Sequence, residues 1–246
     1  YRSRRGEAAR TMVQRRLSAL WPQARGLDVL GYGYATPYLD AYRDDARRAV
    51  AFMPAAQGAM AWPDRRGEKS AVCLGEETRL PFAEAMFDRI IVAHALEEAD
   101  NLQRLLRELW RVLSPEGRLV IIAAHRSGAW ARVDATPLGH GRPFSRGQLT
   151  RALRDALFEP SAWARALYAP PWNWLCGPRT ANGFEAVGEK LWPGFGGLIL
   201  VEAVKHVGAV RPRASLATVR PLEAARPAGL SADQASQATT HKDMTR

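Results

Sequence analysis

The chain has 246 residues, of which 47% are hydrophobic and 24% are charged. This is the composition of a globular protein with one sizeable core, and it excludes collagen-like, coiled-coil and wholly disordered chains. No stretch reaches the roughly 20 apolar residues that a membrane-spanning helix needs, and no apolar segment follows the basic start as in a signal peptide. The two cysteines, Cys73 and Cys176, belong to no paired motif. They therefore indicate neither a disulfide scaffold nor a zinc site, and we expect a reducing, cytoplasmic setting.

The net charge of +10 is concentrated at the two ends of the chain. Residues 1–16 hold six arginines and one glutamate, and residues 205–246 hold seven basic and three acidic residues. Residues 17–204, by contrast, hold 22 basic and 21 acidic residues. Basic ends can attract phosphate backbones. Because the middle is nearly neutral, solvated tails explain the charge more simply, and an RNA-directed function ranks last among those considered.

Apolar periodicity predicts that helices alternate with strands up to about residue 205. A first helix is expected over 8–20, and further helices over 37–47, 55–61, 101–113 and 146–157. Strands are expected over 27–31, 48–53, 70–74, 87–93, 118–124, 161–168 and 197–205. We expect Ser114 to Gly117 to form a turn, and Ser145 with Gln148 to form a capping box.

Composition changes after about residue 207. From residue 208 the chain is rich in Pro, Ala, Ser and Thr and has no apolar period, which predicts a disordered basic tail over 208–246. Residues 1–207 are then expected to form a single domain, with the helix over 8–20 packed on it.

Strands and helices that alternate at this spacing predict an α/β fold with a doubly wound, mostly parallel sheet of seven strands and helices on both faces. In such a sheet, ligands bind beyond the carboxyl ends of the strands, where the strand order reverses. The site is therefore expected in the loops over 31–37, 53–55, 75–82, 93–100 and 125–144.

Three segments follow one another in a specific order: Val29 to Thr36, Gly75 to Phe82, and Phe87 to Ile121. The third is the most specific, because it joins a strand, His-Ala-Leu-Glu, an amphipathic helix and Arg-Val-Leu-Ser-Pro-Glu-Gly before the next strand. Together they resemble class I S-adenosylmethionine-dependent methyltransferases of the type 11 group, which is related to ubiquinone-biosynthesis methyltransferases. The resemblance covers residues 27–205. It implies a Rossmann-like fold, S-adenosyl-L-methionine as the cofactor, and methyl transfer to a small-molecule acceptor.

The resemblance also implies which residues contact the cofactor. Gly33 and Ala35 match the first two glycines of the loop under the methionine moiety. Glu76 matches the acid that binds the adenine amino group, which suits a carboxylate because it only accepts hydrogen bonds. Ala93 and His94 match the strand exit beside the sulfonium. The full set implied for the cofactor is Gly31, Gly33, Tyr34, Ala35, Met53, Glu76, Glu77, Ala93 and His94.

The cofactor loop departs from the family pattern and is degenerate in this sense. Gly31 stands where the family usually has an acid, and Pro37 stands where it has a third glycine. The second strand ends at Met53 and Pro54, without the acid that binds the ribose hydroxyls. Loss of such an acceptor costs about 1.5–3 kcal/mol, or roughly one to two decades in affinity. The alternative is therefore a catalytically inactive protein of this fold that acts as a binding or regulatory partner of another protein.

Methyl transfer requires a base only where the acceptor must lose a proton. His94, at a strand exit, and His140, in a glycine-rich loop after the fifth strand, are the candidate catalytic residues, and His125 is a weaker one. For His94, a packed histidine bonded to the backbone is an equally good interpretation. Glu97 and Glu98 are expected to start or cap the helix that follows.

Tryptophans flank the loops on the expected substrate side. They either form the wall of an apolar acceptor site or cover the edge of the sheet, and both interpretations stay open. The residues concerned are Trp130, Trp172, Trp174 and Trp192. The sequence contains no metal-ligand motif, so no metal is expected.

Overall fold

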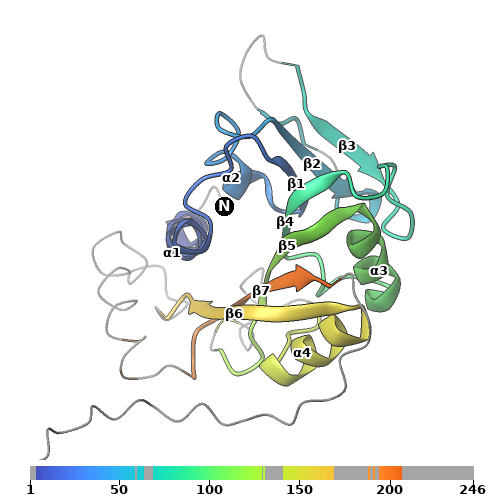
Figure 1. The fold of residues 1–246 in the computed structure, drawn as a ribbon. Helices are drawn as coiled ribbons and strands as arrows, with labels where there is room; N and C mark the ends of the chain where they lie inside the picture. The colour runs from blue at the N-terminus through green and yellow to red at the C-terminus, as the bar shows by residue number, and fades with distance from the viewer. Residues whose placement is uncertain are drawn as a thin grey trace, which may run out of the picture. The chain divides into compact units, whose positions relative to one another are not determined.

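The structure is a computed structural model, and it describes residues 4–58, 60–63, 69–128, 130, 141–168, 188, 191 and 194–206. These residues build one seven-stranded sheet of order β3-β2-β1-β4-β5-β7-β6 (Figure 1). Strands β1 to β5 are parallel, and β7 is antiparallel to both of its neighbours, β5 and β6. The predicted fold class is confirmed. The order reverses between β1 and β4, which is where a doubly wound sheet offers a crevice for ligands.

The elements follow one another in chain order as predicted, with shifts at several ends. They are α1 (Arg4–Leu20), β1 (Asp28–Gly33), α2 (Thr36–Leu39), β2 (Arg48–Pro54), the 3-10 turn η1 (Ala55–Gln57), β3 (Val72–Gly75), β4 (Phe87–Ala93), α3 (Leu102–Val112), β5 (Leu113–Ala124), α4 (Arg146–Asp155), β6 (Phe158–Ala166) and β7 (Leu198–Lys205). The tail predicted over 208–246 lies outside the described residues, so that domain boundary stays a prediction.

Helices cover both faces of the sheet, with α1 and α2 on one face and α3 and α4 on the other (Figure 1). Each face has its own cluster of buried apolar side chains, because successive residues of a strand point to opposite sides. Leu198 and Leu200 of β7 belong to the cluster under α1, whereas Ile199 and Val201 belong to the cluster under α3 and α4. The sheet is therefore buried on both faces, as the continuous apolar runs of its central strands indicate.

A tryptophan at the end of α1 ties this helix to the last described strand. The indole Nε1 of Trp21 donates a hydrogen bond to Oε1 of Glu202 in β7 at 2.8 Å, and the hydroxyl of Tyr42 donates to the Trp21 carbonyl at 2.9 Å. Arg118 and Ser161 also donate to the buried carboxylate of Glu202. These bonds compensate for burying the charge.

The helix predicted over 37–47 is wrong in its extent, because α2 ends at Leu39 and residues 40–46 form turns and bends. After Leu39 the segment contains one large apolar side chain, Tyr42, and otherwise consists of Ala, Asp and Arg. It therefore lacks the apolar stripe that stabilises a helix by packing. The helix predicted over 55–61 is likewise reduced to the single 3-10 turn η1.

The turn predicted at Ser114 to Gly117 lies inside β5 instead of before it. Glu116 has a φ of 57°, and the register of β5 against β4 shifts between Phe87 and Arg89. The strand therefore begins at Leu113 and carries an irregularity that holds the extra residues. By contrast, the capping box of Ser145 and Gln148 is confirmed at the start of α4.

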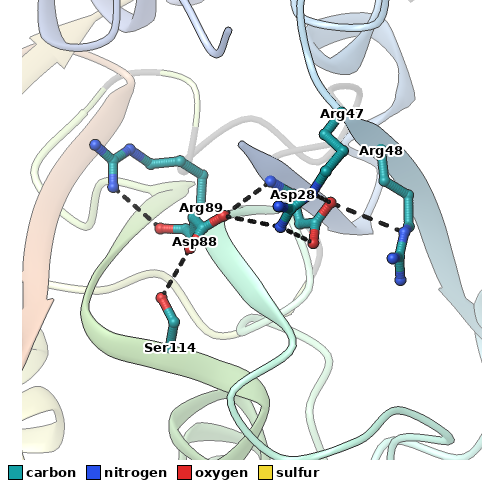
Figure 2. Close-up of polar contacts among 6 residues, drawn as sticks. All are labelled: Asp28, Arg47, Arg48, Asp88, Arg89 and Ser114. Atoms are coloured by element: carbon teal, nitrogen blue, oxygen red, sulfur yellow. Dashed lines mark hydrogen bonds and ion pairs between the residues drawn. The ribbon is translucent and has the colours of Figure 1, made fainter. Parts of the chain in front are cut away.

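Charged side chains join the strands at the end of the sheet opposite to the crevice. Figure 2 shows two carboxylates, at the starts of β1 and β4, among three arginines and a serine: Asp28, Asp88, Arg47, Arg48, Arg89 and Ser114. Arg47 donates to both oxygens of Asp28, at 3.0 and 2.6 Å, and this contact lowers the pKa of Asp28 below its ordinary value. These contacts lie at the amino ends of the strands and stabilise the fold there.

Among the described helices, none is long and apolar enough to cross a membrane.

Candidate active site

A pocket of about 220 Å³ opens at the carboxyl ends of β1 and β2. Its rim is apolar and partly open to solvent, since Tyr34 is 45% exposed and Met60 is 51% exposed. The residues that line it are Gly33, Tyr34, Thr36, Met53, Gln57, Gly58 and Met60. Three of these, Gly33, Tyr34 and Met53, are among the residues singled out in the sequence. The position agrees with the rule that ligands bind at this end of such a sheet.

Gly33 is required where β1 passes into the pocket. Its φ is +73°, and a Cβ placed on it would lie 2.7 Å from the Ala93 carbonyl oxygen and 2.7 Å from the Ala95 Cβ. The next amide, that of Tyr34, donates to the same Ala93 carbonyl at 2.9 Å. The exits of β1 and β4 are thus held against each other by backbone contacts that no side chain at position 33 could accommodate.

Gly31 lies within β1, packs against residues that follow this strand, and does not line the pocket. A Cβ on Gly31 would lie 2.5 Å from Cδ1 of Leu39 and 2.9 Å from the Cβ of Ala35. Leu39 is fully buried and Ala35 is 1% exposed. The space next to Gly31 is therefore filled by the side chains of Leu39 in α2 and of Ala35 at its N-terminal cap.

Gln57 links the exit of β2 to the exit of β4. Its Nε2 donates to the carbonyl of His94 at 3.2 Å and to Oε2 of Glu98 at 3.0 Å. The amide also lines the pocket, so it can donate to or accept from a bound ligand after a small rearrangement. Gln57 and Met60 also line the pocket, but neither is among the residues singled out in the sequence. Their place directly after β2 is the signal that could have found them.

The two acids after β3 differ in what they contact. Oε1 of Glu77 accepts from the backbone amides of Asp100 and Asn101, at 3.0 and 3.4 Å. Glu77 thereby holds the segment before α3. Glu76 makes no hydrogen bond or ion pair with the described residues, and it does not line the pocket.

Burial and the nearby Glu77 raise the pKa of Tyr32, whose ring stacks on Phe52 at 5.4 Å.

His94 lies directly after β4, and its conformation is unusual. Its φ is 51°, a region that residues other than glycine seldom adopt, and its amide donates to the Ile122 carbonyl at 3.0 Å. Ala93, the last residue of β4, is fully buried. Neither residue lines the pocket, but the bond from Gln57 to the His94 carbonyl brings His94 next to it.

The prediction that Glu97 and Glu98 start or cap the next helix is wrong. Asn101 is the N-terminal cap of α3, and its side chain accepts from the Arg104 amide at 3.0 Å. Glu97 is instead 6% exposed, and its Oε1 accepts from the amide of Ala124 at the end of β5, at 2.6 Å.

The remaining candidates divide between the core and the residues that are not described. His125 is 4% exposed, its Nδ1 lies 3.0 Å from the Gly196 carbonyl, and burial lowers its pKa. Trp130 is 3% exposed and packs against Gly197, which favours the interpretation that it covers the sheet. His140 and the other three tryptophans singled out in the sequence lie outside the described residues. Within the described part of the chain, no group of His, Cys, Asp and Glu side chains could hold a metal ion.

Residues 27–121, which run from just before β1 into β5, match the family model described as a methyltransferase domain. These 95 of the 246 residues are therefore similar to a methyltransferase domain. The methyltransferase domain matched here contains the pocket, His94 and Glu97, and the family uses S-adenosyl-L-methionine.

Curated relatives match over part of their length. A malonyl-[acyl-carrier protein] O-methyltransferase of Pectobacterium atrosepticum is 30% identical over 127 residues, which is 49% of this chain and 50% of the relative. A demethylmenaquinone methyltransferase of Mycolicibacterium paratuberculosis is 45% identical over 47 residues, which is 19% of this chain and 20% of the relative. The chain thus spans half or less of the length of these relatives.

Solved structures of methyltransferases have the same fold as this chain. An S-adenosylmethionine-dependent methyltransferase of Thermotoga maritima is 17% identical, with a TM-score of 0.57 over 81% of this chain and 90% of its own. A geranyl diphosphate C-methyltransferase of Streptomyces coelicolor is also 17% identical, with a TM-score of 0.54 over 79% of this chain and 77% of its own.

Proposed function

We propose that this protein transfers the methyl group of S-adenosyl-L-methionine to a small-molecule acceptor. The observation that carries the proposal is the pocket at the exits of β1 and β2, next to the point where the strand order reverses. Its position within the matched methyltransferase domain makes a nucleoside cofactor the first candidate ligand.

The residues present suit such a cofactor. Tyr34 and Met60 offer exposed apolar surface to a flat base and a ribose. Gln57 offers an amide that can pair with hydroxyl or amino groups, and Glu98 places a carboxylate beside it. At about 220 Å³ the pocket is smaller than the roughly 300–1,000 Å³ of ordinary ligand sites, so it holds one part of the cofactor.

The full set proposed for the cofactor joins residues of the family loop to residues that follow β2. Gly33, Tyr34, Met53, Gln57 and Met60 line the pocket directly. Gly31, Ala35 and Ala93 shape the loop from below. Glu76 and Glu77 stay proposed contacts at the exit of β3, and His94 and His140 stay the proposed catalytic residues.

When bound, S-adenosyl-L-methionine supplies a methyl group that is already activated by its sulfonium. The protein then has to orient the acceptor, exclude water and, where needed, take up a proton. His94 is suited to the last role because it lies at the exit of β4, next to Gln57 of the pocket.

Calorimetric titration of the protein with S-adenosylhomocysteine tests this proposal. We expect saturable heat with a dissociation constant between about 1 μM and 1 mM, the range of ordinary substrate affinities. Adenosine triphosphate, which shares the adenosine but lacks the amino-acid arm, serves as the control and should bind at least tenfold more weakly. Absence of heat and of a thermal shift with S-adenosylhomocysteine at about 1 mM would rule the proposal out.

One observation favours a second function. Leu39 fills the space where the family usually has an acid, and β2 ends without the second acid. A catalytically inactive protein of this fold that binds another protein would show this pattern, and it would give no heat in the titration above.

A further inference from the structure

A histidine and a carboxylate lie together at the tips of β4 and β5. His94 follows β4 directly, and Nδ1 of its imidazole lies 3.6 Å from Oε1 of Glu97. The two side chains are 14% and 6% exposed. At this distance the pair is slightly too long for a hydrogen bond, but catalytic pairs are often long before the substrate binds and shorten in the complex.

The hydrogen bond that Glu97 accepts from the Ala124 amide does not require a negative charge on its side chain. One oxygen, Oε1, accepts from the Ala124 amide at 2.6 Å. The other, Oε2, is buried and has no hydrogen-bond partner among the described residues. A glutamine could serve the Ala124 amide equally well without the cost of burying a charge. The neighbouring imidazole faces Oε1 of the same carboxylate, so the buried charge lies beside a group that can carry a proton.

The backbone fixes His94 on both sides. Its amide donates to the Ile122 carbonyl, and its own carbonyl accepts from Gln57, which lines the pocket. The positive φ of His94 is the kind of backbone strain that clusters at functional sites. The imidazole is therefore held at the boundary between the pocket and the tip of β5, with Nδ1 toward Glu97.

We propose that Glu97 is a positioning residue that holds His94 with its proton on Nδ1, so that Nε2 carries the lone pair and acts as the base. This inference rests on the proposed methyl transfer and adds the class of acceptor molecule. The atom that receives the methyl group must carry a proton that it loses in the reaction, as the oxygen of a hydroxyl does. The Nε2 atom takes that proton while the acceptor oxygen bonds to the methyl carbon. The carbon–sulfur bond breaks with its electron pair left on sulfur, and the imidazolium later returns its proton to water.

The test reads the position of the proton directly. Long-range ¹H–¹⁵N spectra of the full chain labelled at histidine distinguish the two neutral forms of each of the five imidazoles. His94→Gln assigns the signals of His94, and a pH of about 8 keeps ordinary histidines neutral. We expect His94 to carry its proton on Nδ1 in the unmodified protein, and Glu97→Gln to move more than half of the population to Nε2.

Asp100→Asn is the matched control, because it removes an exposed carboxylate three residues away from Glu97. This variant should leave the His94 spectrum unchanged. If the unmodified protein carries the His94 proton on Nε2, or if Glu97→Gln leaves the spectrum unaltered, the proposal is overturned. The first result does not depend on Glu97→Gln, so it decides even if that variant does not fold.

Cofactor binding is measured separately. Glu97→Gln should change the S-adenosylhomocysteine dissociation constant by less than twofold, because Glu97 does not line the pocket. A tenfold loss would assign Glu97 to the binding site and would overturn its positioning role. Because the spectra are recorded without cofactor, the proposed function and the role of Glu97 can fail independently.

Discussion

The side chain of Leu39 fills the space that a Cβ at position 31 would need, and a double-mutant cycle measures how much this steric conflict lowers the free energy of unfolding. The Cβ added by Gly31→Ala would lie 2.5 Å from Cδ1 and 2.8 Å from Cγ of Leu39, and 2.9 Å from the Cβ of Ala35. The φ of Gly31 is outside the left-handed region, so the whole cost is steric. Overpacking a closed core costs about 1–3 kcal/mol, and the fully buried Leu39 has little room to move. We expect Gly31→Ala to lower the free energy of unfolding by that amount.

The second arm of the cycle removes the obstacle. Leu39→Ala alone should cost about 2–5 kcal/mol through the cavity it leaves. In that background, Gly31→Ala should cost less than half of its value in the unmodified protein, because the two nearest contacts, with Cδ1 and Cγ of Leu39, are gone.

Urea unfolding followed by tryptophan fluorescence gives the four free energies. Gly147→Ala in α4, where an added Cβ meets nothing within 4 Å, is the control and should stabilise by up to about 1 kcal/mol. A Gly31→Ala variant as stable as the unmodified protein, or an equal cost in both backgrounds, would refute the steric argument.

Three further outcomes follow from contacts described above. Gly33→Ala should weaken S-adenosylhomocysteine binding at least tenfold in calorimetry, because its Cβ collides with the Ala93 carbonyl, and binding at the unmodified affinity would contradict this. Ser145→Ala removes the capping box of α4 and should cost about 1 kcal/mol in urea unfolding, whereas an unchanged midpoint would show that the cap contributes nothing. The pKa of Asp28 is lowered by Arg47, so its ion pair stabilises the fold above the ordinary pKa of 3.8 and is lost as the pH falls. Asp28→Asn should therefore be destabilising at pH 7, and the difference in stability should shrink as the pH falls through the lowered pKa of Asp28; a difference that does not shrink would contradict the linkage.

The order of the strands could be predicted from the sequence because their apolar runs are continuous and bounded by turns. Two of the three errors in extent have local causes. Residues 40–46 have charges at helical spacing but only Tyr42 to bury, and Glu116 adopts a backbone conformation that its residue type does not indicate. Such features depend on tertiary contacts, which override local propensity.

Some of the residues that line the pocket could be predicted from the sequence, and the others depend on tertiary contacts. Gly33, Tyr34 and Met53 follow from the loop motif and from the end of the second strand. Gln57 lines the pocket and lies in the 3-10 turn η1, whereas the sequence predicts a longer helix at this place. The contact of Glu97 with the Ala124 amide joins residues 27 apart, so no local pattern reveals that Glu97 is buried beside His94.

The position of β7 has a consequence for synthesis of the chain. Among the described strands, β6 pairs with β7 alone, and β7 lies between β5 and β6. As the polypeptide leaves the ribosome, β6 emerges with unpaired amide and carbonyl groups on both sides, and β5 presents an open edge that waits for residues 198–205. Both edges are templates for association with other nascent chains. Cellular yield should therefore depend on how quickly β7 emerges after β5 and β6.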